Sequence, residues 1–143
     1  MADQDDPYDL ERFVEAQSRV YDTVRAELRQ AAKRSHWMWF IFPQIKGRGS
    51  SATAVHFAIG SREEAAAYLR HSVLGPRLVE CTRLVLGVKS RTYEQIFGEI
   101  DSLKFRSSMT LFAEVTLKET VFQEALEKYF DGEADALTLE ILE

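Results

Sequence analysis

Apolar residues near the start of the chain recur with the period of an α-helix. Four of them share one face when the segment is drawn as a helix: Phe13, Val20, Val24 and Leu28. Asp9 comes just before this segment and is a residue type that accepts hydrogen bonds from the first N–H groups of a helix. The pattern therefore predicts a helix from residue 10 to the Arg29–Arg34 region, and Ser18 is a point where it can divide in two.

Cap signals predict two further helices in the middle of the chain. Ser61 and Glu64 match the capping box, in which each side chain satisfies a backbone N–H of the other residue, and the helix that follows should run to about His71. Pro76 suits the first turn of the next helix, because its missing N–H has no partner there in any case. That helix carries an apolar stripe of Leu78, Cys81, Val85 and Val88.

The remaining part of the chain is also predicted to be helical, in segments 92–97, 101–112, 120–130 and a last one ending near 142. Gly98 should stop the first of these, and Asp131 with Gly132 should stop the third. Thr120 and Gln123 match a second capping box. Since polar and apolar residues do not alternate over any long stretch, we predict an all-α bundle of about seven or eight helices.

The most apolar stretch, residues 37–42, holds both tryptophans. Its side chains cannot all face water, so the stretch is expected to form the centre of the core. Pro43 favours a helical turn followed by an extended segment. Gly47 and Gly49 then mark a loop, after which Ser50 or Ser51 should cap a short helix through residue 57.

Length and composition indicate one ordinary globular domain over residues 1–143, with residues 1–8 as a flexible acidic N-terminus. The 143 residues are 45% hydrophobic and 29% charged, and no apolar run approaches the ~20 residues of a membrane span. There is no basic-then-apolar leader, and Cys81 is the single cysteine. We therefore expect a cytoplasmic protein without membrane association, and favour a monomer.

The charge is unevenly distributed. The net charge of −5 argues against binding to duplex nucleic acid. However, no Asp or Glu occurs from residue 28 to residue 62, a segment with six cations: Arg29, Lys33, Arg34, Lys46, Arg48 and Arg62. A locally positive field on an acidic protein attracts small anions. The alternative is that the first cations stabilise a helix C-terminus and that the others are simply solvated.

The loop after the aromatic run is a candidate phosphate site. Its N–H groups, the dipole of the following helix and its cations favour an anion at Lys46, Arg48, Ser50 and Ser51. The loop lacks the Gly-Lys-Ser/Thr ending of a nucleotide P-loop. A flexible surface loop is therefore the alternative.

The aromatic run itself supplies further candidates. His36 is placed to act as a general acid or base, and Trp37 or Trp39 can stack on a nucleobase or nicotinamide-like ring, with Gln44 at the far end of the run. The alternative is that both tryptophans are core residues and that His36 is structural. On that alternative, Trp39→Ala should be strongly destabilising.

Lys104, Ser107 and Ser108 share one face of a predicted helix and can present a cation and two hydroxyls to a ligand. The alternative is a solvated face. No Gly-x-Ser-x-Gly or Ser-x-x-Lys motif supports a serine nucleophile.

The three histidines lack metal-ligand spacing, so neither a metal nor a cofactor is predicted. Asp101 and Glu64 could supply a carboxylate, although capping explains both.

The sequence resembles a small bacterial family of unknown function, number eighteen-ten of the domain-of-unknown-function series, sometimes mislabelled calpastatin. The resemblance rests on segments spread over the chain: 36–44, 49–51, 64–71, 74–78, 96–98 and 101–112. It implies a compact helical domain and no particular activity. A distant similarity to the YbiA-like domains that process ADP-ribose derivatives transfers no residues.

Two hypotheses follow from these residues. The first is a pocket for a small phosphorylated ligand, of the nucleotide or ADP-ribose-like kind, with hydrolase or glycosidase chemistry in its catalytic form. The second is a non-catalytic interaction domain with a basic docking patch. A concavity that holds His36, Lys104 and a carboxylate would favour the pocket. A buried His36 with both ring nitrogens bonded to backbone would favour the interaction domain.

Overall fold

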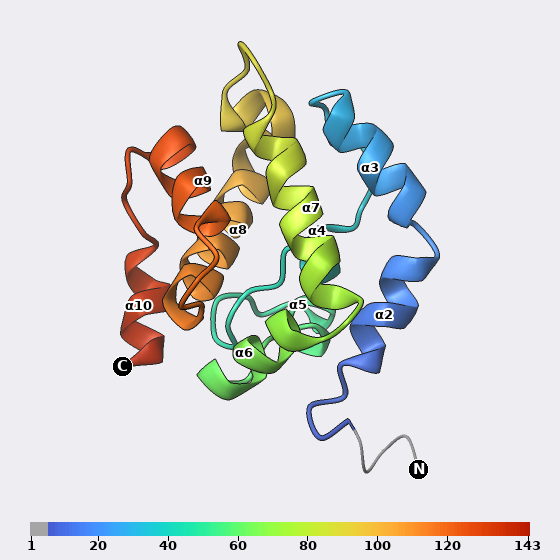
Figure 1. Ribbon diagram of the computed structural model, residues 1–143, viewed down its shortest axis with the longest axis vertical. Helices are drawn as coiled ribbons and strands as arrows, with labels where there is room; N and C mark the ends of the chain where they lie inside the picture. Colours follow the sequence, from blue (N-terminus) through green and yellow to red (C-terminus); the bar gives the residue numbers. More distant parts are fainter. Residues whose placement is uncertain (1–5) are drawn as a thin grey trace.

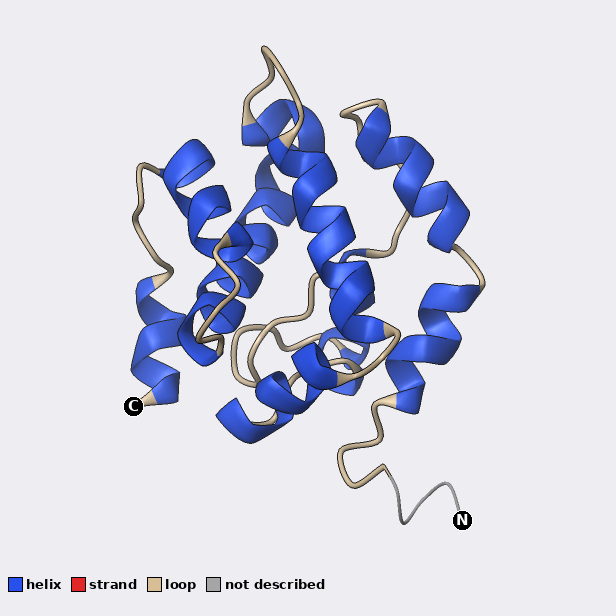
Figure 2. Cartoon of the chain, in the orientation of Figure 1, coloured by secondary structure: helices blue, strands red, loops and turns tan. Residues whose placement is uncertain are grey.

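The computed structural model describes residues 6–143, which form nine α-helices joined by loops (Figure 1). These are α2 Glu11–Ser18, α3 Tyr21–Arg29, α4 Met38–Ile41, α5 Ala52–His56, α6 Arg62–Arg70, α7 Leu74–Leu86, α8 Tyr93–Val115, α9 Val121–Phe130 and α10 Ala136–Leu142. The described part contains no strand (Figure 2), and its one sheet-like contact is the parallel bridge between Ile45 and Ile59. The all-α prediction is confirmed.

The long helix α8 and its neighbour α7 organise the bundle. α8 contacts α4, α6, α9 and α10, while α7 contacts α3, α6 and α9. In Figure 1, α2 and α3 lie on one side of α7, whereas α9 and α10 lie on its other side. Along residues 6–143, no helix combines the length and the apolar character that crossing a bilayer requires.

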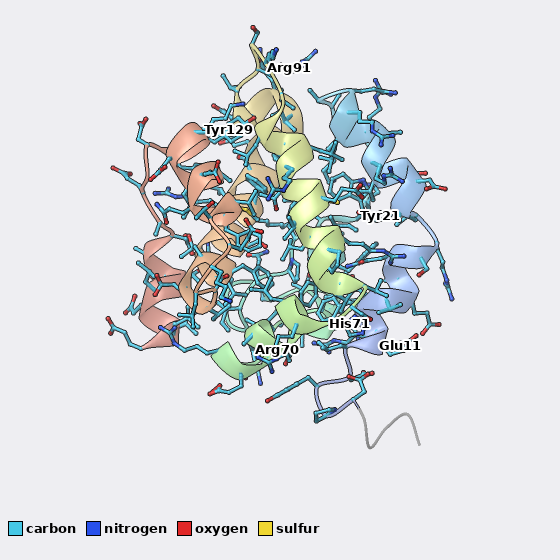
Figure 3. The ribbon with its side chains drawn as sticks, in the orientation of Figure 1. Glu11, Tyr21, Arg70, His71, Arg91 and Tyr129 are labelled. Atoms are coloured by element: carbon cyan, nitrogen blue, oxygen red, sulfur yellow. The ribbon has the colours of Figure 1, made fainter. Side chains whose placement is uncertain are left out.

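Side chains from three segments fix α7 in place (Figure 3). Tyr21 of α3 donates a hydrogen bond of 2.5 Å to the Glu80 carboxylate, and Tyr129 of α9 donates to a main-chain carbonyl near the end of α7. At the start of α7, the ring nitrogen Nδ1 of His71 accepts from the N–H of Leu74 at 3.2 Å. This histidine therefore satisfies one of the N–H groups that a helix start leaves free.

The aromatic run lies at the centre of the core, as predicted, but some of its side chains are only partly buried. Trp37, Ile41 and Phe42 are at most 1% exposed, whereas Trp39 is only partly buried. Phe42 packs edge-on against Phe105 of α8, with ring centroids 5.0 Å apart. The single turn of α4 and the extended exit through buried Pro43 agree with the prediction.

The N-terminal cap differs from the prediction. Asp9 has a positive φ of 52° and does not cap α2. Asp6 does so instead, because its carboxylate accepts from the N–H groups of Leu10 and Glu11 at 2.7 and 3.0 Å. Of the predicted flexible N-terminus, residues 1–5 lie outside the described residues, and Asp6 belongs to the fold.

The second predicted capping box is also wrong. The Thr120 hydroxyl donates to the Glu124 carboxylate at 2.9 Å and does not accept from the start of α9. Glu119 takes that role by accepting from the N–H of Val121 at 3.0 Å. The capping box that does form joins Thr92 and Gln95 at the start of α8.

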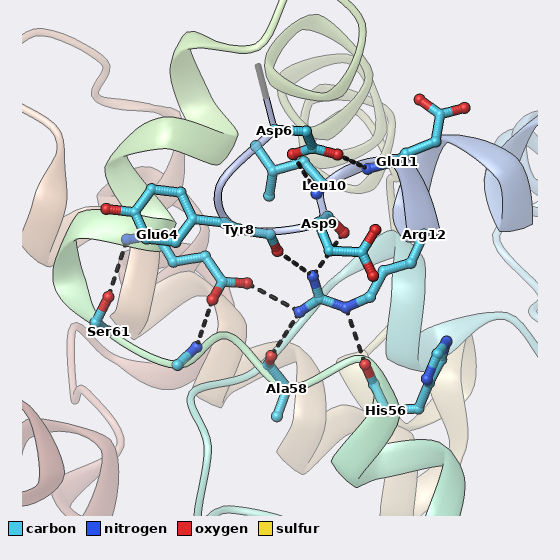
Figure 4. Close-up of polar contacts among 11 residues, drawn as sticks. Asp6, Tyr8, Asp9, Leu10, Glu11, Arg12, His56, Ala58, Ser61 and Glu64 are labelled. Atoms are coloured by element: carbon cyan, nitrogen blue, oxygen red, sulfur yellow. Dashed lines mark hydrogen bonds and ion pairs between the residues drawn. The ribbon is translucent and has the colours of Figure 1, made fainter. Parts of the chain in front are cut away.

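Arg12 ties the N-terminal segment to the middle of the chain (Figure 4). Its guanidinium donates to four main-chain carbonyls and one carboxylate, those of Tyr8, Asp9, His56, Ala58 and Glu64. Glu64 also accepts from the N–H of Gly60, so the predicted capping box of α6 forms only through Ser61. All five donors of the planar group thus have acceptors.

Gly98 interrupts α8 at the residue where the sequence predicted a helix stop. Its φ of 83° and ψ of 169° interrupt the helical path inside Tyr93–Val115. An L side chain rarely adopts this conformation, so glycine is required. The bend sets the direction in which the following turn, with Ile100, Asp101 and Lys104, reaches the surface beside α4.

Candidate functional site

Two adjoining hollows, each of about 460 Å³, contain most of the sequence-predicted site residues. The first hollow is lined by Lys33, His36, Trp39, Phe97, Gly98, Glu99, Ile100, Asp101 and Lys104. The second hollow is lined by Trp39, Gln44, Arg48, Gly49, Ser50, Ser51, Ala54, Ile100, Leu103 and Lys104. Trp39, Ile100 and Lys104 belong to both and form the wall between them.

A chain of charged groups forms one side of the first hollow. Asp101 accepts from Lys33 at 2.7 Å and from Lys104 at 3.2 Å. Burial by itself raises the pKa of Asp101, but the hydrogen bonds and positive charges of Lys33 and then Lys104 outweigh it and lower that pKa. The carboxylate is therefore ionised at neutral pH, and the three groups together carry one positive charge in excess.

Lys33 is buried for a cation, with a side chain only 7% exposed. Its main-chain N–H donates to the Ile96 carbonyl at 2.8 Å, and its ammonium donates to the Ser35 carbonyl at 2.6 Å. The ammonium also lies 5.1 Å from the centroid of the Trp37 ring. His36 comes next in this segment and is exposed, so it faces the first hollow from its rim.

Trp39 and Lys104 meet at the shared wall. The Lys104 ammonium lies 4.5 Å from the centroid of the Trp39 ring, a distance at which the ring attracts a cation. Lys104 is one turn along α8 from Asp101, which binds the same ammonium. The wall thus presents an aromatic ring and a cation held in a defined place.

The second hollow is built on the Gly/Ser loop. The N–H of Ile59 donates to the Gln44 carbonyl at 2.9 Å and the N–H of Lys46 donates to the Ile59 carbonyl at 2.7 Å, which holds the start of the loop against residue 59. A side chain at Gly49 would bring a Cβ within 2.7 Å of the Ala54 Cβ, so only glycine fits here. The loop therefore packs closely onto α5.

The polar residues of this loop have partners within the chain. Ser51 accepts from the N–H of Ala54 at 3.1 Å and caps α5, as predicted. Arg48 pairs with Asp135 at the start of α10, with Nε and Oδ2 3.0 Å apart. Since the Arg48 charge is largely offset, its main contribution to the second hollow is a fixed set of N–H groups.

Four predicted residues lie away from the hollows. Trp37 is a core residue, 1% exposed, and cannot stack on a ligand. Ser107 and Ser108 are both fully buried, and Ser107 shares a 3.0 Å hydrogen bond with Thr138 of α10, which packs against α8. The expectation of an accessible Lys104–Ser107–Ser108 face is therefore wrong. Lys46 is exposed and lines neither hollow.

Sequence reasoning gave too little weight to Lys33 and Asp101. Lys33 was counted among the cations of the acid-free segment, with stabilisation of a helix end as the alternative, and Asp101 was expected to begin a helix. Their pairing joins segments far apart in the chain, and no local pattern reports it. Within residues 6–143, no three or more His, Cys, Asp or Glu side chains lie close enough together to bind a metal ion.

Comparison with known proteins places the domain in a family. The family model described as "Protein of unknown function (DUF1810)" matches residues 7–142. The chain belongs to the DUF1810 family. The expected resemblance is thus confirmed, and both hollows lie within the DUF1810 domain.

A solved structure of high similarity is the conserved hypothetical protein Rv1873 from Mycobacterium tuberculosis, determined at 1.38 Å. It shares 54% sequence identity with this DUF1810 chain over 95% of the chain and 97% of Rv1873, and the TM-score is 0.94. No curated protein matches the chain. The comparisons therefore support the fold and leave the function to be argued from the site.

Proposed function

We propose that this protein binds a small phosphorylated ligand, of the nucleotide or ADP-ribose-like class, in the groove formed by the two hollows. The observation that carries the proposal is the presence of His36, Lys104 and the Asp101 carboxylate in one concavity. Such an arrangement favours a ligand pocket over an interaction domain. We also propose that the protein is monomeric and cytoplasmic.

The charge and shape of the groove support an anionic ligand with a planar ring. Lys33 and Lys104 exceed Asp101 by one positive charge, and the exposed Glu99 of the first hollow offsets this excess, so the attraction for an anion is centred on Lys104, which lines both hollows. Trp39 offers a partly exposed indole to a ring, since stacking of a base on an aromatic side chain is worth about 1–3 kcal/mol.

The catalytic form of the proposal is hydrolysis of a glycosidic or phosphate bond of this ligand. His36 is the general acid or base in this proposal, because its imidazole is exposed and lines the first hollow together with the ionised Asp101. Asp101 is ionised at neutral pH, so it can stabilise a nearby positive charge but cannot donate a proton. Loss of turnover in His36→Ala, measured at saturating ligand so that weaker binding does not limit the rate, is the expected result.

A non-catalytic interaction domain is the second candidate, and one observation favours it. Ile100 and Leu103 on α8 are 71% and 54% exposed beside the groove, so a partner segment could cover them. However, Lys33, Lys104 and Arg48 already pair with carboxylates of this chain, which weakens the attraction of a basic patch for an acidic partner.

A thermal shift panel of nucleotides and ADP-ribose tests the proposal. A ligand at 100 times its dissociation constant adds about 2.7 kcal/mol to the free energy of unfolding, which is a clear rise in melting temperature. The shift should be lost in Lys104→Gln and retained in Lys46→Gln, whose cation lies outside both hollows. No shift with any compound, together with salt-sensitive binding of acidic peptides, would favour the interaction domain.

A further inference from the structure

We infer that the ligand is bipartite, with one group in each hollow and an anionic linker between them at Lys104. This inference rests on the proposed function, because it specifies the ligand of the same groove. Its structural basis is that two hollows of about 460 Å³ each share only Trp39, Ile100 and Lys104. A ligand that uses the whole groove must cross this wall.

The charges place the linker at the wall. Asp101 binds both Lys33 and Lys104, and Lys104 is the one of the two lysines that lines both hollows. Glu99 is exposed and lines only the first hollow, where it offsets the excess positive charge. An anion is therefore more stable beside Lys104 than deep in the first hollow, and a diphosphate suits this position.

The first hollow suits a planar ring. Its apolar lining consists of the partly buried Trp39, Ile100, which is 71% exposed, and Phe97, which is 6% exposed, with His36 at the rim. Beside Gly98 the space is open, since no atom lies within 4 Å of the place where a Cβ would stand. An aromatic ring has flat faces that such a surface can cover, together with ring nitrogens that His36 can bind.

The second hollow suits a hydroxyl-rich group. Gln44, Arg48, Ser50 and Ser51 line it, and they supply both donors and acceptors. Arg48 is fixed by Asp135, so its N–H groups have a defined direction. Arg48 and Ser51 have partners within the chain, so the selection rests on Gln44 and Ser50, to which a sugar offers donors and acceptors and an apolar group offers none.

The test compares one bipartite compound with its two halves. ADP-ribose, AMP and ribose 5-phosphate are titrated separately into the full chain by isothermal calorimetry. Linking two groups that bind adjacent sites should make ADP-ribose bind at least about 100-fold more tightly than either half. AMP binding with the same affinity as ADP-ribose would overturn this inference alone. Failure of all three compounds to bind would overturn the proposed function as well.

Variants of the hollows assign the halves. His36→Ala should weaken AMP about tenfold and leave ribose 5-phosphate unchanged, and Gln44→Ala should do the reverse. Lys104→Gln should weaken all three compounds, and Lys46→Gln should weaken none. Urea unfolding of each variant checks that it remains folded. If His36→Ala and Gln44→Ala weaken the same half, the ligand occupies one hollow and the bipartite arrangement is wrong.

Discussion

The indole N–H of Trp37 donates a hydrogen bond to the Glu27 carboxylate, 3.0 Å from nitrogen to oxygen, and both residues are buried. Glu27 also accepts from the N–H groups of Arg34 and Ser35 and from the Ser35 hydroxyl. A buried carboxylate of α3 is thus satisfied by four donors from the segment that enters the aromatic run. The contact fixes the position of α3 relative to the core.

The two tryptophans should respond differently to truncation. Trp37→Ala should lower the free energy of unfolding by about 3–5 kcal/mol, because it leaves a cavity and removes one of the four donors to Glu27. Trp39→Ala should cost only about 1–3 kcal/mol, since the ring is partly exposed, which revises the expectation from sequence. Urea unfolding followed by circular dichroism measures both. Equal losses would place Trp39 in the core after all.

The pH dependence of stability should report on Glu27. Burial by itself raises the pKa of Glu27, but hydrogen bonds from Ser35, the N–H of Arg34 and the Trp37 indole outweigh it and lower that pKa to about 2. The unfolded value is about 4.3. Because the folded pKa is the lower one, the carboxylate contributes about 3 kcal/mol above pH ~4.3, and this is lost as the pH falls towards 2.

Glu27→Gln supplies the control, since its amide does not titrate in this range. The variant should be less stable than the natural protein at pH 7, and the difference between the two should shrink between pH 5 and pH 2. Asp101, whose pKa is also lowered, titrates in both proteins and so cancels in the comparison. A difference that stays constant over this range would mean that Glu27 does not titrate as described.

The sequence predicted most helices because their periodicity is local, but it could not predict which helix faces are covered. Ser107 does lie on the Lys104 face of α8 by spacing alone. That face is buried because α10, whose Thr138 bonds to Ser107, packs over it. The order in which helices pack is a long-range property, and a single helical period does not contain it.

The charges of the candidate site show the same limit. Arg48 looked like a free cation in an acid-free segment, yet its partner Asp135 lies 87 residues further along the chain. Lys33 likewise pairs with Asp101. A count of charges along the sequence describes local composition, whereas the field at a site depends on carboxylates brought in by the fold. The prediction therefore found the groove residues but overestimated their net charge.

Cys81 should be unreactive in the folded protein. Burial raises the pKa of its thiol to about 12, and the side chain, which belongs to α7, is fully buried with its Sγ 3.8 Å from the Tyr21 hydroxyl of α3. Since the thiolate is the reactive form, a thiol-specific disulfide reagent should label the native protein only as fast as it unfolds. The measurement is the absorbance of the released thiolate with and without urea. Rapid labelling without urea would show that Cys81 is accessible.

Arg12 should be among the most costly charged residues to replace. Its side chain is 13% exposed and that of Glu64 is 9% exposed, with 2.9 Å between their charged atoms. Arg12→Ala leaves Glu64 with a buried charge and frees four carbonyls, so the free energy of unfolding should fall by about 3–5 kcal/mol. Urea unfolding followed by circular dichroism measures the loss.

Arg19→Ala is the matched control, because Arg19 follows the last residue of α2 and pairs with Glu15 in an ion pair whose two side chains are 76% and 67% exposed. It should change the free energy of unfolding by less than about 0.5 kcal/mol. Arg12→Lys separates charge from geometry: an ammonium keeps the attraction to Glu64 but has three donors and no planar fork, so it should recover only part of the loss. If Arg12→Lys unfolds like the natural protein, the charge alone holds this junction, and the bonds to Tyr8, His56 and Ala58 contribute nothing measurable.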